Sequence, residues 1–195
     1  MDELIRPSKH YKEGVVMDTM DKILEVSDYD SLSLFSKKLI DSLQIIHSKI
    51  IRNNTEMFPD RFHPIKSEKW SGLFQDDLIR YSHWKFKDSI VAEQTFFNWL
   101  DQFGPKRISF QLGDKVRLSS DGILILLQDK SIVLYESRKT IKLVELLTLF
   151  NQLGFGKHWE YCILQQKNKK TEWIDCISDT STCLMSLKSI DNRKK

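Results

Sequence analysis

The chain has 195 residues, of which 41% are hydrophobic and 29% are charged, and its formal net charge is +3. This composition is typical of a folded protein and excludes an intrinsically disordered one, which would be poor in apolar residues and rich in charge. No apolar run approaches the roughly 20 residues that cross a bilayer, and the polar N-terminus lacks the basic-then-apolar order of a signal peptide. We therefore expect a soluble protein of the cytoplasm or nucleus, without a membrane span.

The three cysteines point to the same compartment. Cys162, Cys176 and Cys183 form neither a CxxC pair nor an even-numbered disulfide framework. Such spacing favours reduced thiols in an intracellular protein. We expect Cys162 and Cys176 to be small buried thiols.

The charge is spread unevenly along the chain. Residues 1–104 hold 14 Lys/Arg against 17 Asp/Glu, a net charge of −3, whereas residues 105–195 hold 16 against 10, a net charge of +6. The basic half permits an acidic partner, although its charge is below that of a dedicated nucleic-acid-binding domain.

The N-terminal part has the spacing of amphipathic helices. Residues 16–26 place their apolar side chains on one helical face, and residues 31–52 do so more clearly. In the second segment the apolar residues recur three and four positions apart, at Leu32, Phe35, Leu39, Leu43, Ile46 and Ile50. This rhythm predicts a helix that either packs on the protein core or forms a coiled-coil seam, so that self-association through 31–52 stays open.

Three further segments precede the best boundary in the sequence. Residues 53–70 contain two prolines and predict an irregular connection, and "SGLFQDDLIRYSHW" (71–84) predicts a short amphipathic helix. The stretch "FKDSIVAEQTFFNWLDQFGP" predicts a longer helix that Gly104 and Pro105 end.

Beyond Pro105 the period changes from helical to strand-like. "RISFQL" and "KVRLSS" alternate in polarity, and "ILILLQ" and "SIVLYES" are joined by a short polar turn, which predicts an antiparallel meander. The strand "ILILL" is apolar on both sides, so we expect both faces of the sheet to be covered. A helix at 140–153 that ends at Gly154 is one candidate cover.

The C-terminal segments "HWEYCILQ" and "TEWIDCIS" lie on either side of the polar loop "QKNKK". Their alternation predicts a hairpin over 158–178, with a strand followed by a helix as the alternative.

Two short stretches resemble known families. "FQLGD…DGILILLQDKSIVLY" is similar to the strand pattern of polo-boxes, although it inserts "KVRLSS" and no phosphopeptide-binding residue carries over. "KTEWIDCIS" resembles the C-terminal helix of pleckstrin-homology domains, but the basic inositide-binding loop of those domains is missing. Both resemblances imply a small antiparallel sheet closed by a helix.

These patterns together predict an α+β fold. A mainly helical region (1–104) packs against an antiparallel β-meander with an interposed helix and a C-terminal hairpin (105–190), and the two regions form one cooperative unit.

The sequence has no recognisable catalytic, metal-binding or nucleotide-binding motif. Its five histidines are scattered, and "GFG" lacks the Lys-Ser/Thr of a P-loop. Cys162 and Cys176 fall on predicted strands and not at a helix N-terminus, which would activate a thiol. We therefore expect a protein that is not an enzyme and that holds neither a cofactor nor a metal.

The main functional hypothesis is a non-catalytic protein-interaction subunit or adaptor of an intracellular multiprotein complex. It rests on five tryptophans and eleven phenylalanines in a chain without a catalytic pattern, since exposed aromatic side chains often anchor interfaces. The predicted partner-binding residues are Trp84, Phe96 and Trp99.

The alternative hypothesis is nucleic-acid binding by the basic C-terminal half, with lysines on phosphates and an aromatic ring stacked on a base. The predicted residues are Lys115, Arg117, Trp159, Lys167, Lys169 and Lys170.

Overall fold

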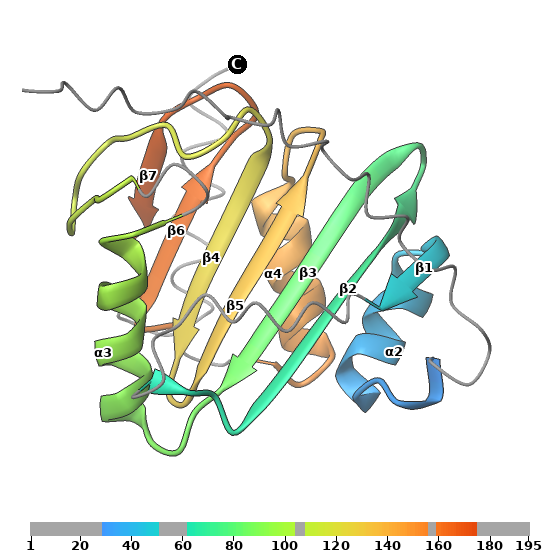
Figure 1. The fold of residues 1–195 in the computed structure, drawn as a ribbon. Helices are drawn as coiled ribbons and strands as arrows, with labels where there is room; N and C mark the ends of the chain where they lie inside the picture. Colours follow the sequence, from blue (N-terminus) through green and yellow to red (C-terminus); the bar gives the residue numbers. More distant parts are fainter. Residues whose placement is uncertain (1–28, 51–61, 104–107, 156–158, 175–195) are drawn as a thin grey trace, which may run out of the picture.

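The computed structural model describes residues 29–50, 62–103, 108–155 and 159–174, and these ranges form one seven-stranded antiparallel sheet with three helices (Figure 1). The helices are α2 (Leu34–Ser42), α3 (Ser89–Leu100) and α4 (Leu143–Gln152). The strands are β1 (Ile46–Ile50), β2 (Lys66–Phe74), β3 (Asp77–Lys85), β4 (Gly122–Gln128), β5 (Ser131–Ser137), β6 (Tyr161–Gln165) and β7 (Thr171–Ile174). None of the helices in these ranges is both long and apolar enough to cross a membrane.

The strand order is β1-β2-β3-β5-β4-β6-β7. The β4–β5 hairpin is therefore inserted so that β5, and not β4, pairs with β3, from Ile79 opposite Ser137 to Lys85 opposite Ser131. This pairing joins the described parts of the two sequence regions, 1–104 and 105–190, within one sheet.

Helices cover both faces of the sheet (Figure 1). Helices α2 and α4 pack on one face through Leu39 and Leu147, and α3 packs on the other through Phe96. We call the core under α2 and α4 the first core, and the core under α3 the second core. Neighbouring residues of a strand point to opposite faces. Leu124 and Leu126 of β4 therefore enter the first core, whereas the second core receives Ile123, Ile125 and Leu127. All five are at most 1% exposed, so the prediction that "ILILL" is covered on both sides is confirmed.

Several predicted elements are present, and the α+β class is confirmed. Strands β4 and β5 and helices α3 and α4 lie in the segments predicted for them. Strands β6 and β7 pair antiparallel, from Cys162 opposite Ile174 to Gln165 opposite Thr171. The C-terminal pair is therefore a hairpin as far as it is described, and 171–174 is not the helix that the pleckstrin-homology resemblance implies.

The predicted helix at 71–84 is wrong, because this segment is most of a β-hairpin. Strand β2 begins at Lys66, inside the predicted irregular connection, and pairs with β3 down to Phe74 opposite Asp77. The two residues between them, Gln75 and Asp76, both have positive φ, of 47° and 62°. Two left-handed residues make the turn whose twist suits a two-residue hairpin. The N-terminal half is therefore not mainly helical where it is described.

The predicted continuous helix over 31–52 is also wrong. Helix α2 ends at Ser42, Gln44 takes a left-handed φ of 50°, and β1 begins at Ile46. Gly72 on β2 allows the segment from Ile45 into β1 to pack closely against β2, because a Cβ atom at position 72 would overlap the Cγ2 atom of Ile45. Self-association through 31–52 remains untested, but the continuous helical seam on which it rested does not exist.

The strands predicted at "RISFQL" and "KVRLSS" do not form in the described residues. Only one isolated bridge, between Phe103 and Ile108, occurs there. The N–H groups of Val116 and Leu118 donate instead to the side chains of Thr171, at 3.0 Å, and Gln165, at 2.6 Å. Side chains of the β6–β7 hairpin thus take the place of a neighbouring strand.

Some predictions fall outside the described residues. These are the helix at 16–26, residues 53–61 of the predicted 53–70 connection, the helix stop at Gly104, and the environments of Cys176 and Cys183.

Candidate functional site

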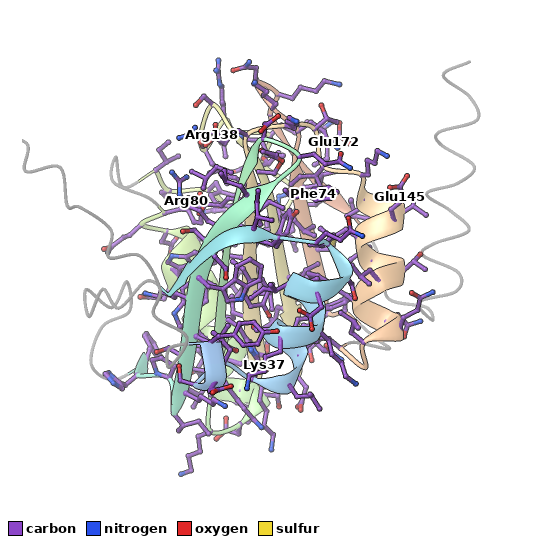
Figure 2. All side chains as sticks on the ribbon, turned by 90° about the vertical axis from the view of Figure 1, so that its right-hand side faces the viewer. Lys37, Phe74, Arg80, Arg138, Glu145 and Glu172 are labelled. Carbon is purple, nitrogen blue, oxygen red and sulfur yellow. The ribbon has the colours of Figure 1, made fainter. Side chains whose placement is uncertain are left out.

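A cavity of about 410 Å³ opens at the end of the sheet where β2 turns into β3, between the end of α2 and the start of α4. Figure 2 shows two of its lining residues, Phe74 on β2 and Glu145 on α4, at the same end of the molecule. The lining residues are Leu43, Phe74, Gln75, Asp77, Tyr135, Ser137, Lys139, Thr140, Ile141, Lys142, Glu145, Leu146 and Leu149.

The walls of the cavity are apolar. Leu43 comes from the end of α2, Phe74 from β2, and Leu146 and Leu149 from one face of α4. Leu43, Phe74 and Leu149 are only partly buried, although they pack against the first core. Their remaining exposed surface makes the cavity favourable for an apolar group of a ligand.

The polar groups of the cavity converge on Asp77, which is only 6% exposed. Its Oδ2 accepts a hydrogen bond of 2.5 Å from the hydroxyl of Ser137, and its Oδ1 accepts one of 3.2 Å from the backbone N–H of Lys139. The register of β3 and β5, with Ile79 opposite Ser137, brings these distant residues together.

Tyr135, two residues before Ser137 on β5, also lines the cavity and interacts electrostatically with Asp77. Burial raises the pKa of the Tyr135 phenol, and the negative charge of Asp77 raises it further. The phenol therefore stays protonated at neutral pH and keeps a hydroxyl that can donate a hydrogen bond.

The rim of the cavity carries charge of both signs. The Lys139 ammonium donates to the backbone carbonyl of Gln75, and Lys142 forms an ion pair with Glu145 at 3.2 Å. Among the described residues no ion pair includes Asp77, so its charge is held by hydrogen bonds alone.

The three predicted partner-binding rings are in the second core and not at the surface. Trp84, Phe96 and Trp99 are 1%, 0% and 3% exposed, and the two tryptophan rings meet edge to face at 5.5 Å. These rings hold α3 on the sheet. Their positions give no support to a direct role in partner binding.

The predicted nucleic-acid residues divide into two places. The guanidinium of Arg117 donates to the side-chain carbonyl of Asn168 at 2.7 Å, and the N–H of Thr171 donates to the carbonyl of Val116 at 2.7 Å. These bonds tie the segment around Arg117 to the β6–β7 turn. They gather the exposed side chains of Lys115, Arg117, Lys167, Lys169 and Lys170 at one end of the sheet, and we call this set the basic cluster.

Trp159 is not part of the basic cluster. It is 1% exposed, packs in the first core, and precedes β6, whereas the three lysines follow β6. The ring that does lie beside the cluster is Trp173, whose Nε1 donates to the carbonyl of Asp114 at 3.2 Å.

His83 of β3 belongs to a group of aromatic rings on the face of the sheet that α2 and α4 cover, beside Tyr81 and Phe155. Its ring meets Phe155 edge to face at 5.2 Å, and its Nε2 has no hydrogen-bond partner among the described residues. Burial lowers the pKa of His83 to about 4. The imidazole is therefore neutral at physiological pH.

We expect acid to destabilise the protein through His83. An unfolded histidine has a pKa of about 6.5, so the unfolded chain binds more protons as the pH falls below that value. Lowering the pH from 7.5 to 5 should then reduce the free energy of unfolding by about 2 kcal/mol through this residue alone. Urea titrations at both pH values should show this loss in the wild type and its absence in His83→Phe. His63→Ala, at an exposed histidine, should keep the full pH dependence.

Sequence reasoning missed the cavity. Its residues come from α2, the β2–β3 turn, the end of β5 and the start of α4, and no local pattern links them. The one available signal was the amphipathic helix at 140–153. In the described residues, no group of three or more His, Cys, Asp or Glu could hold a metal ion.

Comparison with known proteins identifies no relative of this chain. No family model matches it, and neither a curated protein nor a solved structure is significantly similar.

Proposed function

We propose that this protein is a non-catalytic interaction subunit, and that it holds a segment of a partner protein in the cavity between α2 and α4. The observation that carries the proposal is the cavity itself, with apolar walls and polar groups converging on Asp77. Its volume of about 410 Å³ lies within the roughly 300–1,000 Å³ range of ligand sites.

A cavity of this kind suits an anchor side chain from a partner. Binding energy at protein interfaces concentrates in a few side chains that fill well-packed pockets. Filling this cavity would remove the remaining exposed surface of Leu43, Phe74 and Leu149 from water, which is favourable by about 25 cal/mol per Å² of apolar area.

An intracellular location forms part of the proposal. Cys162 is buried and free, and burial raises the pKa of its thiol to about 12. A protonated, enclosed thiol is inert. The three cysteines of the chain, an odd number without the spacing of a disulfide framework, support a reducing compartment such as the cytoplasm or nucleus.

Site-specific photo-crosslinking in cells of the native source tests the proposal. A benzophenone amino acid placed at Leu149, inside the cavity, should yield one discrete cross-linked partner. The same amino acid at Asn151, an exposed position on the same helix, should yield little of that product. Equal cross-linking from both positions, or none from Leu149, would contradict the proposed site.

Nucleic-acid binding is a second candidate function, and the basic cluster is the observation that favours it. The hydrogen bonds of Arg117 and Thr171 gather five cationic side chains from two separate loops. Phosphates attract such a cluster, and the partly exposed ring of Trp173 is available for base stacking.

Charge removal at the cluster tests this second function. The triple variant Lys167→Ala, Lys169→Ala, Lys170→Ala should weaken binding to single-stranded probes by about ten-fold or more, and similarly for all sequences. The matched variant Lys66→Ala, Lys85→Ala, Lys87→Ala removes the same charge from three exposed lysines near the opposite end of the sheet and should bind normally. If the wild type fails to bind at low salt, this function is excluded.

A further inference from the structure

We infer that the cavity takes the side chain of an arginine or lysine from a partner polypeptide, with the cationic group on the carboxylate of Asp77. This inference rests on the proposed function, because it names the chemistry of the anchor that the cavity receives.

The first argument is the isolated charge of Asp77. A buried carboxylate is costly unless it is paired and hydrogen-bonded. Asp77 is 6% exposed and accepts bonds from Ser137 and from the N–H of Lys139, but no cation pairs with it in the described part of the chain. A cation bound in the cavity would supply the missing partner.

The second argument is the free capacity of this carboxylate. Each of its oxygens accepts one hydrogen bond from the described residues, at 2.5 Å and 3.2 Å, whereas a carboxylate offers about four acceptor positions. Both oxygens therefore retain acceptor capacity. The planar guanidinium of arginine donates in pairs to such groups, and the lysine ammonium donates as a point charge.

The third argument is the match between the walls and the stem of a basic side chain. Lysine and arginine bury their methylene stems against apolar surface and hold the charged end in polar surroundings. Leu43, Phe74, Leu146 and Leu149 supply the apolar walls, and Asp77 supplies the polar end.

The rim adds a requirement for the residues that flank the anchor. Lys139 is held on the carbonyl of Gln75, and Lys142 is paired with Glu145. The two lysines outnumber the one glutamate at the mouth, so the rim repels positive charge beyond the one group that Asp77 binds, and like charges at an interface select against wrong partners. The partner segment is therefore a single basic residue with neutral or acidic neighbours, and not a polybasic tract.

Peptide pools with one fixed central residue test the inference on the full-length protein. The central residue is arginine, lysine, citrulline, norleucine or glutamate, and the flanks are degenerate mixtures without basic residues. We expect the arginine or lysine pool to shift the amide resonance of Lys139 and its neighbours in NMR titrations. That pool should bind about ten-fold or more tightly than the citrulline and norleucine pools, because a hydrogen bond to a charged group is stronger than a neutral one.

Two variants with equal charge changes localise the effect. Asp77→Asn should reduce the affinity for the basic pool by about ten-fold or more. Asp76→Asn is the matched control, because Asp76 is exposed, does not line the cavity and has a φ of 62° that asparagine tolerates. Asp76→Asn should bind as the wild type does. If Asp77→Asn does not fold, the arginine-to-citrulline ratio on the wild type decides alone.

The possible failures are distinct. Equal or tighter binding of the norleucine pool would overturn the cationic anchor and leave the proposed function standing. If no pool perturbs the amide resonances around the cavity, the cationic anchor and the proposed function both fail. Free n-butylguanidinium or n-butylammonium that binds as tightly as the basic pool would mean that the cavity takes a small amine, which overturns the polypeptide source.

Discussion

Replacing Ile125 with alanine is expected to lower the free energy of unfolding by about 2 to 5 kcal/mol, which is the usual cost of truncating a fully buried isoleucine. Ile125 is central in β4 and 0% exposed. It lies opposite Leu134 of β5 and Ile163 of β6, on the face that α3 covers. The truncation leaves a hole between three strands that cannot easily collapse. Urea unfolding followed by circular dichroism measures the loss.

Ile90→Ala is the control for Ile125→Ala. Ile90 is 66% exposed on α3, so the same chemical change should cost less than about 0.5 kcal/mol there. A loss below about 1 kcal/mol at Ile125 would show that the face of β4 under α3 is open to solvent.

Replacing Gln165 with leucine is expected to cost about 2 to 4 kcal/mol, because backbone groups would lose their buried partners. Gln165 is 0% exposed at the end of β6. Its Oε1 accepts from Leu118 at 2.6 Å, and its Nε2 donates to the carbonyls of Ser119 and Asp121 at 2.9 Å and 2.8 Å. Leucine has a similar size but can make none of these bonds. Urea unfolding and amide exchange at Leu118 report the two consequences.

Gln165→Glu separates the hydrogen bond that Gln165 accepts from the two that it donates. A carboxylate still accepts from Leu118 but cannot donate to Ser119 or Asp121. We expect Gln165→Glu to keep slow exchange at Leu118, and Gln165→Leu to lose it. Gln152→Leu, at an exposed position of α4, should leave both measurements unchanged. Unchanged stability in Gln165→Leu would mean that water replaces the glutamine.

The parts of the fold that sequence patterns predict are those in which one period persists. In α4, Leu143, Leu146, Leu147 and Phe150 recur at helical spacing and are all buried. In β4 a continuous apolar run correctly predicts two covered faces. Local spacing predicts these elements because their apolar residues recur at one constant period, and that period marks the face that is buried.

The missed hairpin shows where spacing misleads. Phe74 and Leu78 are four residues apart, which suggests one helical face, yet a turn at Gln75 and Asp76 separates them. Neither turn residue is glycine or asparagine, the usual signals for positive φ. The alternation of apolar Ile79 and Tyr81 with polar Arg80 was the available sequence signal for a strand.

Helix α2 shows the limit of the heptad pattern. The apolar spacing continues past Ser42, but Ile45 and Ile46 are β-branched, which favours a strand. The candidate site was beyond prediction for a different reason. Asp77 and Ser137 are 60 positions apart in the chain, and only the pairing of β3 with β5 brings them together.

The placement of β5 beside β3 also has a consequence for synthesis on the ribosome. The hairpin β2–β3 is complete at Lys85, but the strand that closes the other edge of β3 begins at Ser131, roughly 45 residues later. At about 5–20 residues per second, this interval lasts a few seconds. During that time the nascent chain presents an unpaired edge beside Ile79 and Tyr81, which is a template for wrong pairing. Newly made chains should therefore engage chaperones until β5 emerges, and ribosome profiling of chaperone-bound nascent chains should show that engagement end once β5 has left the exit tunnel.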